Sequence, residues 1–147
     1  MSNLHLNTTL FEQLLKDGKE NLDLQVGIVS KVDGDNYKLI AIDDVANEFK
    51  PGEVLHVNKT YCRDVIAERK TIALTEIDGI RGLQQHPLYA VNTLEAYIGA
   101  PIILNENVWG TINFTSMVVR PAKFSSSDIK LVNSYAGLIA ESLAKNN

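Results

Sequence analysis

The chain lacks the features that mark several large classes of protein. Its 147 residues include a single cysteine, Cys62, so no internal disulfide framework can form. Lysine and arginine form no basic run, and the formal net charge is −4, which argues against nucleic acid because phosphate contacts need a dense basic surface. The longest apolar stretches, such as residues 99–104, are far too short to cross a bilayer.

The remaining composition is that of an ordinary folded domain. The first 18 residues contain Glu12, Lys16 and Asp17 and lack the apolar segment of a signal peptide. Hydrophobic residues make up 45% of the chain and charged residues 22%, and the length fits one domain spanning residues 1–147. We therefore expect a cytoplasmic protein with no membrane segment in this chain.

The periodicity of apolar residues predicts the order of helices and strands. The expected elements are, in order, a helix over 7–16 ended by Gly18, strands over 24–32 and 37–42, a loop over 43–52, a helix over 58–70, a strand over 71–77, a connection over 78–93 with a short helix near 88–91, strands over 94–104 and 108–116, and a helix from Ser125. This order predicts an α+β domain built on one antiparallel sheet.

The strand over 108–116 has one polar but uncharged face, formed by Thr111, Asn113 and Thr115. Such a face suits a protein that holds a small molecule without reacting with it. A buried amide without a partner costs about 1–3 kcal/mol, so Asn113 must bond to a ligand, a water or a neighbouring loop. Tyr97, on the preceding strand, can join this face, whereas Gly99 is more simply interpreted as a backbone device for a bulge or tight packing.

The last predicted helix is the most periodic element of the chain. Ser125 and Asp128 have the spacing of a capping box, which marks the start of the helix. Two interpretations are open for its wide apolar surface: a broadly buried helix, or one stripe on the sheet and a second on a partner chain. The first stripe comprises Ile129, Val132, Ala136, Ile139 and Leu143, and the second comprises Leu131, Tyr135 and Leu138.

An ordered set of short motifs resembles the GAF domain family, in particular the small-molecule sensors of bacterial signalling proteins. No single motif is specific, but their order runs from Pro51 to the C-terminus. The motifs are Tyr61–Ala67, Ile72–Thr75, His86-Pro87, Tyr97–Pro101, Trp109–Phe114, and Arg120 followed by Phe124–Asp128.

The resemblance implies a central antiparallel sheet of about five or six strands. It also implies that the N- and C-terminal helices share one face, where many members dimerise, and that the middle helix and long loops cover a ligand pocket on the other. Ile112 and Phe114 would then point to the terminal helices. The candidate pocket residues are Tyr61, Cys62, Asp78, His86, Tyr97, Thr111, Asn113 and Thr115, and the candidate dimer residues are Leu10, Leu14, Leu131, Tyr135 and Leu138.

Three better-defined functions of the family fit this chain poorly. Members that bind cyclic nucleotides carry Asn-Lys where Ser116-Met117 stands here, and Ile129 replaces a glutamate of their motif. Members that reduce free methionine sulfoxide use several cysteines, because one thiol attacks and another resolves the intermediate. Members that carry a bilin attach it through a cysteine in the long connection, whereas Cys62 lies in the middle helix.

Several single residues have two interpretations each. Cys62 is either a redox sensor or, more often for a lone cysteine, a buried small hydrophobe. His86 is either a pocket imidazole or haem ligand, or a turn residue next to proline, and Asp78 is either a pocket carboxylate or an ordinary turn residue. His5 and His56 are too scattered from His86 to suggest a metal site, and no spacing fits zinc.

We therefore expect a non-catalytic sensory domain with an unidentified ligand and no assigned cofactor. It would pass its signal by shifting the packing of its terminal helices in a homodimer, and the resemblance implies a kinase or a cyclic-dinucleotide synthesis domain as output. The first alternative is a degenerate GAF domain used for protein interaction, its pocket filled by Tyr61 and Tyr97. The second is an enzyme of the sulfoxide-reductase type.

Overall fold

One six-stranded sheet and three helices make up the described part of this computed structural model, which comprises residues 7–44, 50–56, 62–74, 95–117 and 122–145. The elements are α1 (Thr8–Leu22), β1 (Val26–Asp33), β2 (Asn36–Asp44), β3 (Val54–His56), α2 (Cys62–Glu68), β4 (Ile72–Leu74), β5 (Ala96–Leu104), β6 (Asn107–Ser116) and α3 (Ser126–Lys145). The strands are antiparallel, in the order β3-β2-β1-β6-β5-β4. The predicted α+β fold is confirmed.

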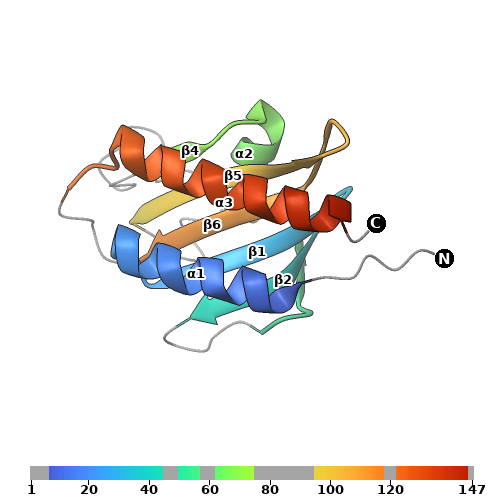
Figure 1. Ribbon diagram of the computed structural model, residues 1–147, viewed down its shortest axis with the longest axis horizontal. Helices are drawn as coiled ribbons and strands as arrows, with labels where there is room; N and C mark the ends of the chain where they lie inside the picture. Colours follow the sequence, from blue (N-terminus) through green and yellow to red (C-terminus); the bar gives the residue numbers. More distant parts are fainter. Residues whose placement is uncertain (1–6, 45–49, 57–61, 75–94, 118–121, 146–147) are drawn as a thin grey trace.

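The helices cover the two faces of the sheet unequally. Helices α1 and α3 lie side by side on one face, in front of the sheet in Figure 1. Helix α2 packs against β5 and β6 from the other face. The expectation that the terminal helices share a face, with the middle helix opposite, is confirmed.

Two separate cores follow from this arrangement, because successive strand residues point to opposite faces. On the side of α1 and α3, Ile112 and Phe114 are fully buried with Phe11, Leu15 and Ile139, and we call this the helix-side core. The α2-side core is smaller and more polar. It consists of Tyr37, Leu39, Cys62, Val65 and Tyr97.

Helix α1 is longer than the sequence predicts, and the expected stop at Gly18 is wrong. The Asn7 side chain accepts a hydrogen bond from the backbone of Leu10 at 3.1 Å and caps the start, but the helix runs on to Leu22. It ends at Asp23, which has a left-handed φ of 57°. Gly18 is buried within the helix, at a place where a β-carbon would lie 2.2 Å from the Phe114 ring. This glycine is therefore needed for packing and does not end the helix.

The remaining elements follow the predicted order; β1 and β5 begin two residues later than predicted, whereas β2 and β6 extend beyond their predicted limits. The sequence pattern missed β3, because its three residues pair only with the start of β2 at the sheet edge. The helix predicted over 58–70 ends earlier, at Glu68 of α2, and the strand predicted over 71–77 begins at Ile72 of β4. The other ends of both predictions fall in residues 57–61 and 75–94, which lie outside the described residues. The expected short helix near 88–91 also lies outside them.

Helix α3 begins as its capping box predicts. The backbone of Asp128 donates to Ser125 Oγ at 3.1 Å, and the backbone of Ser125 donates to the Asp128 carboxylate at 2.8 Å. A stripe running from Val132 to Leu143 is buried against the sheet, and it includes Tyr135, whose hydroxyl donates to the Asp17 carboxylate of α1. Leu138 lies outside this stripe.

A bulge in the β5–β6 pair turns Trp109 to the helix side. The register of the two strands shifts between Ile102 and Ile103. Trp109 therefore leaves the face shared by Thr111 and Asn113 and joins the helix-side core with 8% of its surface exposed. Its indole Nε1 has no hydrogen-bond partner among the described residues.

Candidate functional site

The candidate site centres on Cys62, the first residue of α2, which is 1% exposed. Its Sγ accepts hydrogen bonds from Tyr97 Oη at 3.1 Å and from Thr111 Oγ1 at 3.3 Å. It also accepts one from Asn113 Nδ2 at 3.2 Å and donates one to Tyr37 Oη at 3.4 Å. One thiol therefore ties α2 to strands β2, β5 and β6.

Further hydrogen bonds join these side chains to one another. Asn113 Nδ2 also donates to Tyr37 Oη at 2.9 Å, and the hydroxyls of Ser30 and Thr111 lie 2.8 Å apart. The backbone of Thr111 donates to Ser30 Oγ at 3.2 Å. We call the whole set the Cys62 cluster. It consists of Ser30, Tyr37, Cys62, Tyr97, Thr111 and Asn113.

The strand register explains why these residues meet. Ser30 pairs with Thr111 across β1 and β6, and Gly99 pairs with Asn113 across β5 and β6. Tyr97 lies two residues before Gly99 on the same face of β5, and its side chain extends over that glycine. The absent side chain at Gly99 thus leaves room for the phenol to reach Cys62.

The Cys62 cluster contains no charged side chain, and its phenols stay protonated. Burial raises the pKa of Tyr37 well above its ordinary value, and the neighbouring Cys62 raises it further. Burial and Cys62 raise the pKa of Tyr97 in the same way. A site lined by these phenols, hydroxyls and an amide can hold uncharged polar groups.

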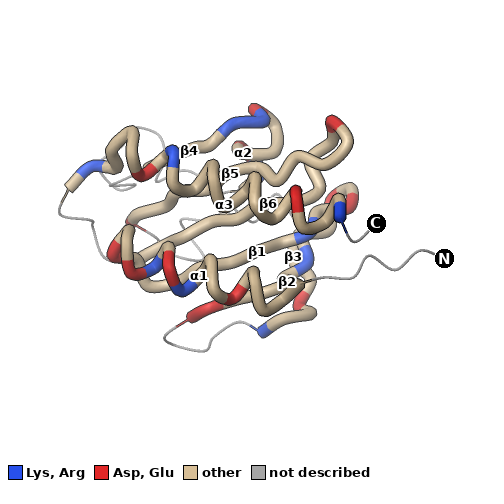
Figure 2. Tube along the Cα trace, in the orientation of Figure 1, with Lys and Arg blue, Asp and Glu red and all other residues tan. Residues whose placement is uncertain are grey.

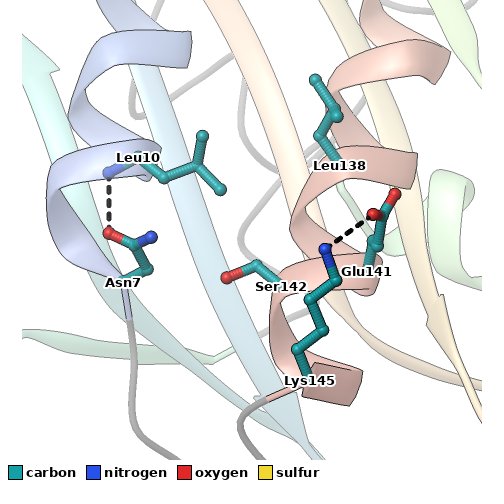
Figure 3. Close-up of a pocket in the computed structure, with 6 residues that line it drawn as sticks. All are labelled: Asn7, Leu10, Leu138, Glu141, Ser142 and Lys145. Carbon is teal, nitrogen blue, oxygen red and sulfur yellow. Dashed lines mark hydrogen bonds and ion pairs between the residues drawn. The ribbon is translucent and has the colours of Figure 1, made fainter.

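A second concave feature lies on the opposite side of the sheet, between the start of α1 and the end of α3. This groove has a volume of about 330 Å³. Figure 3 shows the Ser142 hydroxyl pointing across it toward α1, and Glu141 paired with Lys145 along α3 at 3.1 Å. The lining residues are Asn7, Leu10, Leu138, Glu141, Ser142 and Lys145.

Charges are mixed over the surface of the molecule. Figure 2 shows basic and acidic residues interspersed along α1, α3 and the strand ends, without a large patch of either sign in the described ranges. In those ranges no three or more His, Cys, Asp and Glu side chains are grouped to hold a metal ion. Within the described residues, none of the helices combines the length and apolar character that crossing a membrane requires.

Residues 7–143 match the family model of the GAF domain. The chain belongs to the GAF domain family. GAF domains are typically sensory or regulatory modules. Comparison with curated protein sequences finds no match.

Solved structures similar to this GAF domain include proteins of different activities. The blue-light absorbing form of the Thermosynechococcus elongatus PixJ GAF domain is 18% identical, with 91% of this chain and 84% of that chain covered and a TM-score of 0.66. The type II free methionine-R-sulfoxide reductase from Thermoplasma acidophilum is 15% identical, covering 95% and 93%, with a TM-score of 0.73. The GAF domain from Acinetobacter phosphoenolpyruvate-protein phosphotransferase is 14% identical, covering 99% and 96%, with a TM-score of 0.71. At these identities the likeness shows the fold alone.

Four predicted pocket residues of this GAF domain lie together, namely Cys62, Tyr97, Thr111 and Asn113. Thr115 is 6% exposed and pairs with Tyr97 across β5 and β6. The other three predicted pocket residues lie outside the described residues. They are Tyr61, Asp78 and His86.

Two members of the Cys62 cluster, Ser30 and Tyr37, were missed by the sequence analysis. Both come from the β1–β2 hairpin, for which the sequence predicts only two strands of the sheet. The signal that could have found Ser30 is the alternation of β1 set against β6, which pairs Ser30 with Thr111. No sequence signal places Tyr37 there, because its partner Asn113 is 76 positions away in the chain.

The predicted dimer residues differ in how much of their surface is available. Leu14 and Tyr135 are 9% and 3% exposed, buried in the helix-side core of their own chain. Leu10 and Leu131 are half-buried, and Leu138 is 46% exposed. Leu10 of α1 and Leu138 of α3 both line the groove of Figure 3. The surface open to a partner is therefore centred on Leu138.

Proposed function

We propose that this chain is a non-catalytic sensory domain that responds to a small, uncharged polar molecule. The observation that carries the proposal is the Cys62 cluster. Its sheet residues are Ser30, Tyr37, Tyr97, Thr111 and Asn113; they lie buried under the short helix α2, and we call them the polar floor. Thr111 and Asn113 lie on the sheet and Cys62 lies on α2, so their hydrogen bonds fix the position of α2 relative to the sheet. A ligand group that accepts from Thr111 and Asn113 would take the place of the thiol and displace α2.

The chemistry of the floor sets the class of ligand. Its donors are the hydroxyls of Tyr97 and Thr111 and the amide of Asn113, and Sγ is their common acceptor. A carbonyl, amide or hydroxyl oxygen can replace that acceptor. A charged group would be left without an opposite charge, which makes its burial costly.

The test is native mass spectrometry of the purified protein, followed by thermal shift measurements with uncharged sugars, amides and nucleosides. We expect a retained small mass, or a compound that raises the melting temperature by about 2 °C or more. Asn113→Ala should abolish that rise, whereas Asn21→Ala, at an exposed asparagine of α1, should leave it unchanged. No retained mass together with no stabilising compound would count against the proposal.

A second function, favoured by one specific observation, is a protein-interaction module with a self-filled site. Sγ of Cys62 already occupies the centre of the polar floor and uses its donors. Cys62→Ala should then create a cavity that holds water but no metabolite. Binding of a compound to wild-type protein that Asn113→Ala abolishes would exclude this alternative.

Catalysis of the sulfoxide-reductase type has less support. The chain has one cysteine, and its thiol is buried and engaged in hydrogen bonds, whereas that chemistry needs a second thiol to resolve the intermediate. We expect no loss of free methionine sulfoxide on incubation with the protein and dithiothreitol. Consumption of free methionine sulfoxide that Cys62→Ser abolishes would support the enzymatic function.

We also propose partners and a location for this chain. We expect a homodimer through α1 and α3, a kinase or cyclic-dinucleotide synthesis domain as output, and a cytoplasmic location. The support for the dimer is the exposed Leu138 beside a groove on the outer face of the two terminal helices.

A further inference from the structure

The two faces of the sheet are joined by a side-chain link around its β4 edge. Helix α2 lies on one face, and the chain leaves it through residues 69–71 to enter β4. Thr71 Oγ1 donates a hydrogen bond to Asn133 Oδ1, which belongs to α3 on the opposite face. The junction after α2 is therefore tied directly to a terminal helix.

Segment 62–71 has fixed points at both ends. At its start, Cys62 is held by the hydrogen bonds of the Cys62 cluster. At its end, Arg69 has a left-handed φ of 55°, and its guanidinium donates to the Glu106 carbonyl in the β5–β6 turn at 2.6 Å. A helix moves as a stiff unit, so a displacement at Cys62 would tilt the whole of α2 about Arg69 and pull on Thr71.

A displacement at the Cys62 cluster could also reach α3 directly through the sheet, but this route requires a more costly structural change. Strand β6 is hydrogen-bonded on both sides, to β1 and β5, and its Ile112 side chain is fully buried in the helix-side core. Shifting β6 would break two ladders and disturb a packed core. Strand β4 has three residues in the described part of the chain and pairs there only with β5, so it can move at lower cost.

We propose that α2 and the Thr71–Asn133 hydrogen bond form a lever that couples the Cys62 cluster to α3 around the β4 edge. This inference deepens the proposed function, because it names the path by which a change at the polar floor reaches the terminal helices. Its output is the position of the α3 turn that contains Asn133 and precedes the exposed Leu138.

The experiment is amide hydrogen exchange of α3 in four proteins: wild type, Cys62→Ser, Thr71→Val and the double variant. Serine shortens the side chain at position 62 and so moves the acceptor atom away from the donors of Tyr97, Thr111 and Asn113, while valine keeps the shape of threonine without the hydroxyl. We expect Cys62→Ser to speed exchange over residues 130–137 by about threefold or more in the wild-type background. In the Thr71→Val background the same substitution should change it by less than about 1.5-fold.

Two controls make the result specific. Ser134 lies next to Asn133, but in the described part of the chain its hydroxyl bonds only to the Leu131 carbonyl within α3, so the response to Cys62→Ser should persist in a Ser134→Ala background. Helix α1 packs on the same face as α3, and its exchange should not change. If Cys62→Ser fails to fold, Tyr97→Phe removes a single hydroxyl from the cluster and replaces it in the same design.

Each outcome of the hydrogen-exchange experiment either supports or overturns the lever. An equal response with and without Thr71→Val, an equal rise in α1 and α3, or no response in α3 would each overturn the lever. Loss of the response only in the Thr71→Val background supports it. No ligand is used, so failure to find a ligand and failure of the lever are independent results.

Discussion

The phenol of Tyr97 extends over Gly99 two residues further along β5. A β-carbon at position 99 would lie 2.3 Å from Tyr97 Oη and 2.8 Å from its ring carbon Cζ, well inside the distance at which atoms can pack. This glycine is needed because the Tyr97 hydroxyl must pass over it to reach Sγ of Cys62 at 3.1 Å. The backbone of β5 and the polar floor therefore depend on each other.

Gly99→Ala should displace the Tyr97 ring and break its bond to Cys62. We expect a loss of about 1–3 kcal/mol in the free energy of unfolding, measured by urea denaturation. Tyr97→Phe should cost less, and the double variant should cost less than the sum, since both act on one hydroxyl. Additive costs would show that the two residues are not coupled.

Gly18→Ala should destabilise the protein even though alanine favours helix. A β-carbon at position 18 would lie 2.2 Å from the Phe114 ring, and the overpacking of about 1–3 kcal/mol outweighs the gain of about 1 kcal/mol in helix propensity. Replacing the ring with the smaller leucine side chain, in the double variant with Phe114→Leu, should recover part of the lost free energy of unfolding. A more stable Gly18→Ala protein would contradict the packing described for α1 on β6.

Ser125→Ala should remove the cap of α3. The loss of its hydrogen bond to the Asp128 backbone predicts a cost of about 1 kcal/mol, read from thermal or urea unfolding. Ser127→Ala, at an exposed serine of the first turn, is the matched control and should cost less than about 0.5 kcal/mol. Equal costs would mean that the capping box does not stabilise the helix.

Stability should fall in alkaline solution. Burial raises the pKa of Tyr37 and Tyr97, and burial together with Asp17 raises that of Tyr135. A raised folded pKa means that the unfolded chain loses these protons first, above about pH 10, so stability is complete below that pH and declines above it. Tyr37→Phe should flatten the decline by about 1.4 kcal/mol per pH unit, as measured by urea denaturation between pH 8 and 11.

Leu138→Glu should weaken self-association without harming the fold. The side chain is 46% exposed, so the charge costs one chain little, but it would be buried at an interface between copies. We expect wild type to be dimeric and the variant monomeric by light scattering, with unchanged melting of the monomer. Ala144→Glu, at an exposed position on α3, is a control for added charge. A monomeric wild type would refute the dimer.

Much of the fold could be predicted from the sequence because its signals are local. Alternation in β1, β5 and β6 and the Ser125 capping box each depend on neighbouring residues, and each has its counterpart in the structure. The local rule failed at Gly18, where a contact with Phe114, 96 positions away in the chain, overrides the usual meaning of glycine in a helix.

The candidate site could be predicted only in part. The polar face of β6 is visible as alternation, so Thr111 and Asn113 could be named in advance. Tyr37 and the closing of the floor by Cys62 depend on sheet register and on the docking of α2, neither of which leaves a local pattern. The sequence therefore named Cys62, Tyr97, Thr111 and Asn113 as pocket residues, but not the place of the Cys62 thiol at the centre of their hydrogen bonds.

The bulge that turns Trp109 toward α1 and α3 gives the domain a natural spectroscopic reporter. Trp109 is the only tryptophan in the chain, and its indole is 8% exposed with no hydrogen bond to Nε1 among the described residues. Its fluorescence reports on the helix side of the sheet, the face opposite the Cys62 cluster. Emission that shifts when the polar floor is perturbed would therefore record, in real time and without a label, a signal that has crossed the protein.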